Sequence, residues 1–450
     1  MTTLAPARAC AYLALRRVFE RGAYAEIALR TQAAELDSRD RALAMRLVYG
    51  TVQRRGTLDY VIERLAERAP ERLDAPLLAA LRLGCYELLY LRGAPDHAVV
   101  ADAVELAKGA GRGHGLVNAV LRRATREGPA LLAELRDDTP ERAAVAHSHP
   151  LWIARLWWQE LGAQDARALL AFDNEPAELA LRANTLISDP PTLARELAQG
   201  TPPVPTRADP SIPEALVVEG PVDLRRLPQW HAGALLAQSR AAMLPARALA
   251  PRPGERVLDL CAAPGGKSTH LAALMENDGE IVAVEHNPQR AAELERAVRR
   301  LRTSCVRVVL ADAARPLTQE GQFDRVLVDP PCSGLGTLQA RADLRWRISE
   351  RQVPELARKQ AEILATGAAA VRPGGVLVYS TCTISPHENE RQIFDFMESN
   401  PDFSLDDLWG DADRSAEPRL GAPAMDGRAL LTLPHRDRTA GFFIARLRRN

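Results

Sequence analysis

The 450-residue sequence predicts a multidomain protein with an all-α N-terminal part, a small α+β part and a C-terminal α/β part. Three observations carry this prediction: helical spacing of apolar residues near the N-terminus, prolines between short elements in the middle, and buried β-branched runs alternating with helices thereafter. We expect the boundaries at residues 1–140, 141–239 and 240–450. The composition is 46% hydrophobic, with 58 basic and 58 acidic side chains, which excludes a fibrous or disordered chain.

The N-terminal part has the spacing of an all-α domain. From residue 6 to about residue 123, apolar residues recur at intervals of three and four, which places them on one face of a helix. Glycines and prolines, densest at residues 108–115, divide this pattern into several short helices. Residues 1–136 carry 21 basic and 16 acidic side chains, a net charge of +5. That charge agrees equally well with a solvated surface and with one that binds RNA.

The middle part mixes short elements. We expect an aromatic helix at 149–162, a strand at 178–184 and a helix at 190–200, followed by proline-rich loops. We expect the tryptophans of the aromatic helix to take part in packing rather than to stack on nucleotide bases; they are Trp152, Trp157 and Trp158.

The C-terminal part alternates short β-branched runs with helical stretches. The expected strands are residues 256–260, 280–285, 306–310, 323–329, 375–381, 429–433 and 441–447. Buried runs of this kind, separated by helices, predict a mostly parallel, doubly wound sheet. Ligands of such sheets bind at the carboxyl ends of the strands.

A glycine-rich loop, LDLCAAPGGKSTH at residues 258–270, follows the first of these strands. Its small residues let a ligand approach the backbone, and the next helix offers free amides at its start. The first glycine of a P-loop is replaced by Cys261, and the dinucleotide pattern G-x-G-x-x-G is absent, so neither a nucleoside triphosphatase nor a dehydrogenase is favoured. The candidate ligand-binding residues of the loop are Cys261, Ala262, Ala263, Pro264, Gly265, Gly266 and Lys267.

Three successive strands end in a carboxylate beside this loop, at Glu285, Asp312 and Asp329. An acidic residue at the end of the second strand is placed to hold two ribose hydroxyls. Since no phosphate-binding motif accompanies them, the residues favour an adenosine-type cofactor, and S-adenosyl-L-methionine is the natural candidate.

Two cysteines also stand at strand ends, Cys332 in DPPCSGLGTL (329–338) and Cys382 in STCTISPHENE (380–390). A thiolate that adds to carbon 6 of cytosine makes carbon 5 nucleophilic enough to attack an activated methyl group. A second group is useful for releasing the product, and a nearby carboxylate can hydrogen-bond the ring. This chemistry alone does not rank the two thiols.

These motifs, together with ARADLRWR at 340–347, resemble the RNA cytosine-5 methyltransferases of the NOL/NOP/Sun family. Residues 81–91, 96–108 and 116–123 resemble the NusB family of RNA-binding proteins. The combined resemblance implies a NusB-like helical RNA-binding domain, an intermediate domain and a Rossmann-like methyltransferase domain. It also implies S-adenosylmethionine-dependent methylation of carbon 5 of a specific cytidine in 16S (small-subunit) ribosomal RNA, through an adduct between a cysteine and carbon 6.

The resemblance further implies a role for each site residue. Cys382 would be the nucleophile and Cys332 would assist product release, while Asp329 would lie between the cofactor and the base. The loop 261–267 would contact the cofactor, Glu285 its ribose and Asp312 its adenine.

The sequence departs from the family pattern in three places. Glu285 stands where Asp is more common, Gln238-Ser239 where a Gln-Asp pair is common, and Arg345 where Lys is common. Because Arg is always charged and cannot act as a base, we expect Arg345 only to position the RNA base.

Two alternatives remain. A non-catalytic RNA-binding or ribosome assembly factor with a vestigial methyltransferase fold would need neither thiol. An enzyme that methylates an exocyclic amino group would carry an aromatic residue where Cys332 stands.

The remaining expectations concern partners and location. The six cysteines show no metal-ligand or disulfide spacing, so we expect neither a metal site nor a disulfide framework. No signal peptide or long apolar segment is evident, and we expect a cytoplasmic protein that does not bind membranes. The expected partner is ribosomal RNA, free or partly assembled, with its target base exposed in a loop or an opened helix. The sequence does not fix the oligomeric state, for which we expect a monomer.

Overall fold

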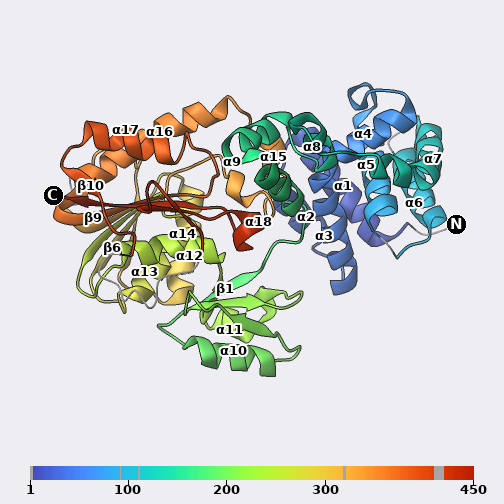
Figure 1. Ribbon diagram of the computed structural model, residues 1–450. Helices are drawn as coiled ribbons and strands as arrows, with labels where there is room; N and C mark the ends of the chain where they lie inside the picture. The colour runs from blue at the N-terminus through green and yellow to red at the C-terminus, as the bar shows by residue number, and fades with distance from the viewer. Residues whose placement is uncertain (1–3, 92, 110–111, 318–320, 410–419) are drawn as a thin grey trace. The chain divides into compact units, whose positions relative to one another are not determined.

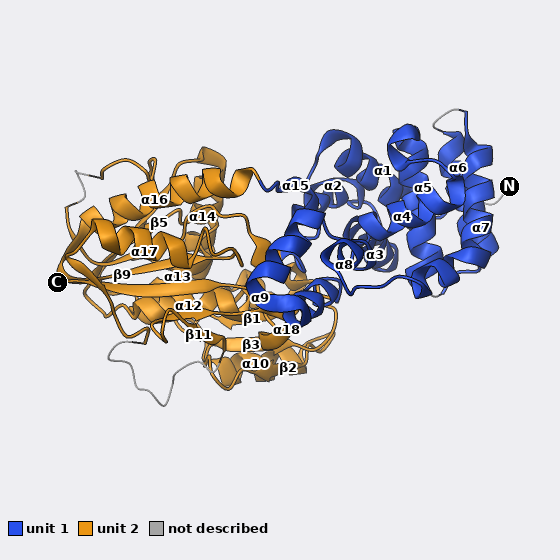
Figure 2. Cartoon of the chain, turned by 45° about the horizontal axis from the view of Figure 1, so that its top comes forward, with its two compact units in different colours: residues 1–175, 338–350 blue, residues 176–337, 351–450 orange. Residues whose placement is uncertain are grey.

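A computed structural model describes residues 4–91, 93–109, 112–317, 321–409 and 420–450. The chain forms two compact units (Figure 2). Unit 1 holds residues 1–175 and 338–350, and unit 2 holds residues 176–337 and 351–450. This division differs from the boundaries expected at residues 140 and 239. The aromatic helix expected in the middle part belongs to unit 1, while the small sheet of that part belongs to unit 2.

Unit 1 is all-α in its described residues, as predicted (Figure 1). Its core is built around one central helix, which is mostly apolar and buried along most of its length. Gly84 of that helix allows close packing, because a Cβ there would lie 2.7 Å from Leu121 Cδ1. The helices are α1 (Pro6–Arg21), α2 (Ala25–Gln32), α3 (Ser38–Gln53), α4 (Arg55–Ala66), the central α5 (Ala75–Tyr90), α6 (Asp96–Lys108), α7 (His114–Ala133), α8 (Pro140–Ala146), α9 (Leu151–Phe172) and α15 (Leu344–Arg347).

Helix α9 covers residues 151–162 of the predicted aromatic helix and continues beyond it. Its backbone breaks at Gly162, where φ is +78°, and this is the residue at which the predicted helix ends. Trp157 is fully buried and lies against the His149 ring, with 5.8 Å between ring centroids, while Trp152 and Trp158 are half-buried. Packing therefore accounts for Trp157.

The small sheet of unit 2 is antiparallel, with the strand order β2-β3-β1-β4. Side chains alternate across its strands, so Leu181 packs with Leu193 and Leu197 of the helix α10, while Arg182 points to the opposite face. The elements are β1 (Ala180–Ala183), α10 (Pro190–Gln199), β2 (Thr206–Ala208), β3 (Ala215–Val218), α11 (Pro228–His231) and β4 (Leu235–Ala237).

The large sheet of unit 2 has the order β11-β12-β13-β9-β8-β5-β6-β7, and β10 also pairs with β13. Strands β5 to β9 are parallel, whereas β13 runs antiparallel to β9. The strands are β5 (Arg256–Leu260), β6 (Glu280–Glu285), β7 (Val306–Leu310), β8 (Phe323–Val328), β9 (Val371–Thr381), β10 (Phe403–Leu405), β11 (Ala422–Ala424), β12 (Ala429–Leu431) and β13 (Phe443–Arg449). Each strand predicted in this part is present, which confirms the doubly wound α/β fold.

Helices cover both faces of this sheet (Figure 1). One face packs on α16 (Gln352–Ala370) and α17 (Glu390–Ser399), and the other on α12 (Arg240–Leu249), α13 (Gly266–Leu274) and α14 (Pro288–Leu301). Burial on both faces explains why the central strands are continuous apolar runs rather than alternating ones. A short helix, α18 (Pro434–Asp437), precedes β13.

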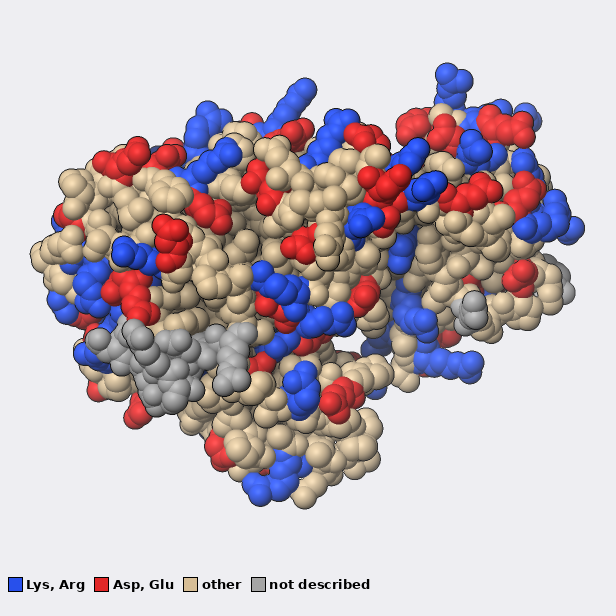
Figure 3. Space-filling model, in the orientation of Figure 1, with Lys and Arg blue, Asp and Glu red and all other residues tan. Residues whose placement is uncertain are grey.

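Lys and Arg side chains alternate with Asp and Glu over the face drawn in Figure 3, in keeping with the equal numbers of the two kinds. None of the helices in the described part of the chain combines the length and the apolar character that crossing a bilayer requires.

Candidate active site

The candidate site lies where the strand order of the large sheet changes direction. From β5 the chain continues to β6 on one side, and β8 occupies the other side. The register aligns Leu260 at the end of β5 with Val284 and Val328 of the neighbouring strands, and Val328 with Tyr379 of β9. The loops that follow these four strands therefore meet at one edge, the usual ligand site of such sheets.

The glycine-rich loop connects β5 to α13. Gly265 has a φ of +103° and directly precedes the helix, and a Cβ there would lie 2.7 Å from Leu294 Cδ1 of α14. The Ala262 amide donates to the Val284 carbonyl at 2.9 Å, and Arg290 Nη2 donates to the Ala263 carbonyl at 2.7 Å. The loop is thus held against β6 and α14.

The small sheet also supports this loop. The Arg182 guanidinium is buried and donates to the Gly266 carbonyl, to Thr269 Oγ1 at 2.8 Å and to Gln238 Oε1 at 2.8 Å. Burial lowers the pKa of Arg182 to about 9. Sequence reasoning did not single out Arg182, because nothing local in ELALRAN indicates what its side chain contacts.

Glu285 ends β6 as predicted and is 2% exposed. Its Oε1 accepts a hydrogen bond from the Asn287 amide at 2.9 Å. Its Oε2 is buried without a hydrogen-bond partner among the described residues, and Arg290 Nη1 lies 3.5 Å away. A buried acceptor of this kind needs a donor, which a ribose hydroxyl would supply.

Asp259, which sequence reasoning missed, is a second buried carboxylate at this edge. Its Oδ2 accepts from Ser268 Oγ at 2.6 Å, while its Oδ1 has no hydrogen-bond partner within the described residues. Burial raises the pKa of Asp259 to about 7, and Asp329 adds to the rise. Its position at the end of β5, inside the glycine-rich motif, was the signal that could have identified it.

The other two predicted carboxylates, Asp312 and Asp329, differ in their contacts. Asp312 follows β7 at the rim, where its Oδ1 accepts from the Ala314 amide at 3.0 Å, and that hydrogen bond lowers its pKa. Asp329 follows β8 and is paired: Lys267 Nζ lies 2.6 Å from its Oδ2, and Ser380 Oγ donates to its Oδ1 at 3.0 Å. Burial opposes the charge on Lys267, but Asp329 reverses that effect, and the pKa of Lys267 is raised.

The two predicted thiols are brought together. Cys332 Sγ and Cys382 Sγ lie 3.3 Å apart, although 50 residues separate them in the chain. The hydrogen bond with Cys382 and burial together raise the pKa of Cys332 well above its ordinary value. This shift favours the protonated form of Cys332.

The site can hold an adenosine-type cofactor with a positive centre. Asp259, Glu285 and Asp329 lie close enough to Cys261 to raise its pKa, which burial brings to about 12. This concentration of carboxylates favours a cationic ligand, and the two unpartnered carboxylate oxygens favour one rich in hydrogen-bond donors. Among the described residues, His, Cys, Asp and Glu form no cluster of three or more that could hold a metal ion.

Comparison with known proteins identifies the family. Residues 246–448 match the family model described as 16S rRNA methyltransferase RsmB/F, residues 5–126 match the NusB family, and residues 149–225 match the RsmF/B-like ferredoxin-like domain. A Synechocystis protein described as "Probable ribosomal RNA small subunit methyltransferase B" is 34% identical over 98% of this chain and 99% of its own length. The chain belongs to the ribosomal RNA small subunit methyltransferase B family.

Other relatives support the same assignment. A Bacillus subtilis protein with the same description is 34% identical over 97% of both chains. A solved structure titled "Crystal Structure of PH0851" covers 99% of both chains with a TM-score of 0.84 and 26% identity. A methyltransferase homolog from Pyrococcus horikoshii covers 68% of this chain and 98% of its own, with a TM-score of 0.60 and 28% identity.

In this member of the methyltransferase B family, Arg345 lies in unit 1, whereas the thiols lie in unit 2. Its side chain is fully buried, and its guanidinium donates to three carbonyls and one side-chain amide oxygen: those of Ser148, Asp173, Leu338 and Asn174. Burial lowers the pKa of Arg345 to about 10. These contacts give Arg345 a structural role, and the predicted role in positioning a base stays a prediction.

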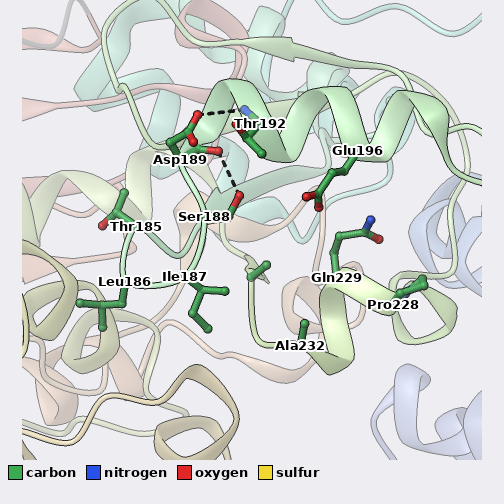
Figure 4. Close-up of a pocket in the computed structure, with 11 residues that line it drawn as sticks. Thr185, Leu186, Ile187, Ser188, Asp189, Thr192, Glu196, Pro228, Gln229 and Ala232 are labelled. Atoms are coloured by element: carbon green, nitrogen blue, oxygen red, sulfur yellow. Dashed lines mark hydrogen bonds between the residues drawn. The ribbon is translucent and has the colours of Figure 1, made fainter.

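A pocket of about 500 Å³ lies in the small-sheet part of this family member (Figure 4). Its lining comes from the segment before α10, from α10 itself and from the region of α11, with Glu196 and Gln229 directed into the same space. It contains none of the predicted site residues, so it is distinct from the loop and the thiols described above.

Proposed function

We propose that this protein methylates carbon 5 of a cytidine in 16S ribosomal RNA, with S-adenosylmethionine as methyl donor and Cys382 as nucleophile. The observation that carries the proposal is the pair of thiols 3.3 Å apart at the carboxyl edge of a methyltransferase sheet. The family's descriptions as 16S rRNA and small subunit methyltransferases support the RNA substrate. The NusB-like part and its net charge of +5 over residues 1–136 support RNA binding.

S-adenosylmethionine, when bound, supplies an electrophilic methyl group. The loop 261–267, Glu285 and Asp312 would hold its adenosine part, with the Oε2 atom of Glu285 accepting from the ribose. Asp259 and Asp329 would face its positive centre. These residues fit such a ligand because they combine close backbone approach, unpartnered acceptors and negative charge.

The chain's own residues would then act on the cytosine ring. The Cys382 thiolate adds to carbon 6, and the electron pair released onto carbon 5 forms the new bond to the methyl carbon. The bond between that carbon and the donor's sulfonium sulfur would break at the same time, and the donor would leave as S-adenosylhomocysteine. The proton on carbon 5 then passes to solvent, the electron pair that it leaves behind restores the double bond between carbons 5 and 6, and the bond between sulfur and carbon 6 breaks to regenerate the Cys382 thiolate. Cys332, which lies next to Cys382, is placed to assist this release.

Two neighbours would help during addition. The Lys267 cation contributes positive charge near Cys382, which favours the thiolate. Asp329, held by Lys267 and Ser380, is placed to hydrogen-bond the polar edge of the base and so stabilise the adduct.

The test is a denaturing-gel assay for a covalent complex of protein and RNA. Unmodified 16S RNA and S-adenosylmethionine are mixed with wild type, Cys382→Ala or Cys332→Ala, and Cys305→Ala, half-buried beside another part of the core, is the control. We expect Cys332→Ala to accumulate an adduct and Cys382→Ala to form none. The reverse pattern would exchange the two roles.

The product must also be analysed, because the alternatives predict different ones. Nucleoside mass spectrometry after digestion distinguishes 5-methylcytidine from a base methylated on its amino group. A product methylated on the amino group would support the amino-group alternative. RNA binding by wild type without any methyl transfer would support the assembly-factor alternative.

A further inference from the structure

A buried carboxylate that the chemistry above does not use lies beside the two thiols. Glu388 belongs to the segment between β9 and α17 and is fully buried. It lies in the STCTISPHENE motif at 380–390. Burying a carboxylate is costly unless several donors satisfy it, so its contacts indicate what it is there to hold.

The carboxylate contacts the residues that immediately follow each thiol. Its Oε1 accepts from the Ser333 amide at 2.8 Å, and its Oε2 accepts from Ser333 Oγ and, at 3.4 Å, from Thr383 Oγ1. Ser333 follows Cys332, and Thr383 follows Cys382. The two hydroxyl oxygens are themselves 2.6 Å apart. One carboxylate therefore joins two loops that are 50 residues apart in the chain.

Other buried groups hold this link in place. Gln360 Nε2 on α16 donates to Glu388 Oε1 at 3.0 Å and to the Pro331 carbonyl at 3.0 Å. The Tyr379 hydroxyl donates to the Glu388 carbonyl at 2.7 Å. The position of the carboxylate is thus set by α16 and β9, which belong to the rigid frame of the sheet.

We propose that Glu388 is a positioning residue that clamps the Cys332 and Cys382 loops together. The proposal rests on the proposed function, since the two clamped loops carry the thiols to which that function gives addition and release. The geometry carries it, because the carboxylate is hydrogen-bonded to both loops at once. The electrostatics agree: after the hydrogen bond with Cys382, burial and the charge of Cys382, the charge on Glu388 also contributes to the raised pKa of Cys332.

The test uses full-length Glu388→Gln, which keeps the shape but removes the charge and presents an amide group to the Ser333 donors. The matched control is Glu398→Gln, an exposed carboxylate on the neighbouring helix α17. The first measurement is the pH dependence of iodoacetamide alkylation at each of the two thiols, read by peptide mass spectrometry. The second is single-turnover methyl transfer to unmodified 16S RNA.

In Glu388→Gln we expect Cys332 to be alkylated at lower pH than in wild type. We expect methyl transfer to fall by roughly 10- to 100-fold, because small displacements of reacting groups have effects of that size. Glu398→Gln should match wild type in both measurements. A Glu388→Gln variant that folds and keeps both the wild-type alkylation profile and the wild-type transfer rate overturns the clamp.

A second variant covers the case in which Glu388→Gln does not fold. Ser333→Ala removes one hydroxyl contact but keeps the carboxylate and the backbone amide bond. We expect it to shift the alkylation of Cys332 and slow transfer in the same direction, by a smaller factor. If it behaves as wild type in both measurements, the clamp is wrong. The alkylation measurement needs no RNA, so it tests the clamp separately from the proposed function. If wild type transfers no methyl group, the proposed function is refuted, while the alkylation profiles of the variants still test the clamp.

Discussion

Replacing Arg345 by methionine tests whether this residue is a structural anchor or a base-positioning residue. Four buried oxygens lose a charged donor: the Asp173 carbonyl at 3.0 Å, Asn174 Oδ1 at 3.0 Å, and the Ser148 and Leu338 carbonyls at 3.2 Å. Each buried acceptor left unpaired costs about 1–3 kcal/mol. The loss is partly offset because methionine has no buried charge to desolvate. We therefore expect Arg345→Met to lower the free energy of unfolding by about 3 kcal/mol.

The assay is urea unfolding followed by circular dichroism, with a thermal scan beside it. For a domain of this size, about 3 kcal/mol corresponds to a fall of roughly 6–12 °C in Tm. Arg341→Met is the control, because Arg341 is exposed on the same segment. This variant should unfold at the wild-type midpoint. Arg345→Lys should lie in between, because an ammonium group cannot reach four spread acceptors. Wild-type stability of Arg345→Met, combined with a raised KM for RNA, would refute the anchor and favour base positioning.

Three more predictions concern single contacts. Burial raises the pKa of Asp173 to about 7, so the folded protein binds a proton there that the unfolded chain releases, and this contribution to stability is lost as pH rises from about 4 to 7. The free energy of unfolding of Asp173→Asn should therefore rise relative to that of wild type across this window, by up to ~1.4 kcal/mol per pH unit. Urea titrations at each pH measure this difference, and a difference that does not change with pH would contradict the prediction. Gly265→Ala should weaken S-adenosylhomocysteine binding at least ~10-fold in calorimetry, because the added Cβ would lie 2.7 Å from Leu294 Cδ1 and the backbone φ is +103°. Gly427→Ala is the control, since Gly427 also has a positive φ of +84° but lies in open space, and this variant should bind normally. Glu285→Gln should also weaken that binding by ~10-fold, since the glutamine amide has one oxygen and cannot accept hydrogen bonds at both positions of the carboxylate. An unchanged Kd would show that the buried Oε2 does not face the ligand.

The architecture of unit 2 could be predicted well because its signals are local. The buried β-branched runs and the glycine-rich loop each occupy a few consecutive residues, and each predicted strand is found. Parallel strands joined by helices place their carboxyl ends at one edge, so the sequence also indicated that Glu285, Asp329 and Cys382 would gather there. No information beyond the order of the elements was needed for that conclusion.

The helical unit was predicted less completely. Apolar spacing correctly indicated helices, but it does not show which helices share a core. For that reason the aromatic helix α9 was expected with the small sheet, although the structure groups it with unit 1. The segment 338–350 could not be assigned to unit 1 from its own residues, because contacts with distant residues of that unit place it there. Asp343 accepts from the Ala25 amide, Trp346 Nε1 donates to the Val52 carbonyl, and Arg345 Nη2 donates to the Asp173 carbonyl.

By itself, then, the sequence determined the order of the elements, the fold of each part and the edge of the sheet at which the candidate site residues gather. Only the tertiary structure decided that Cys332 and Cys382 lie 3.3 Å apart, that Glu388 joins their loops, and that Arg345 is buried. The reason is the range of the interactions. Backbone conformation and side-chain periodicity depend on residues a few positions away, whereas burial and protonation depend on whichever distant segments fold against a group.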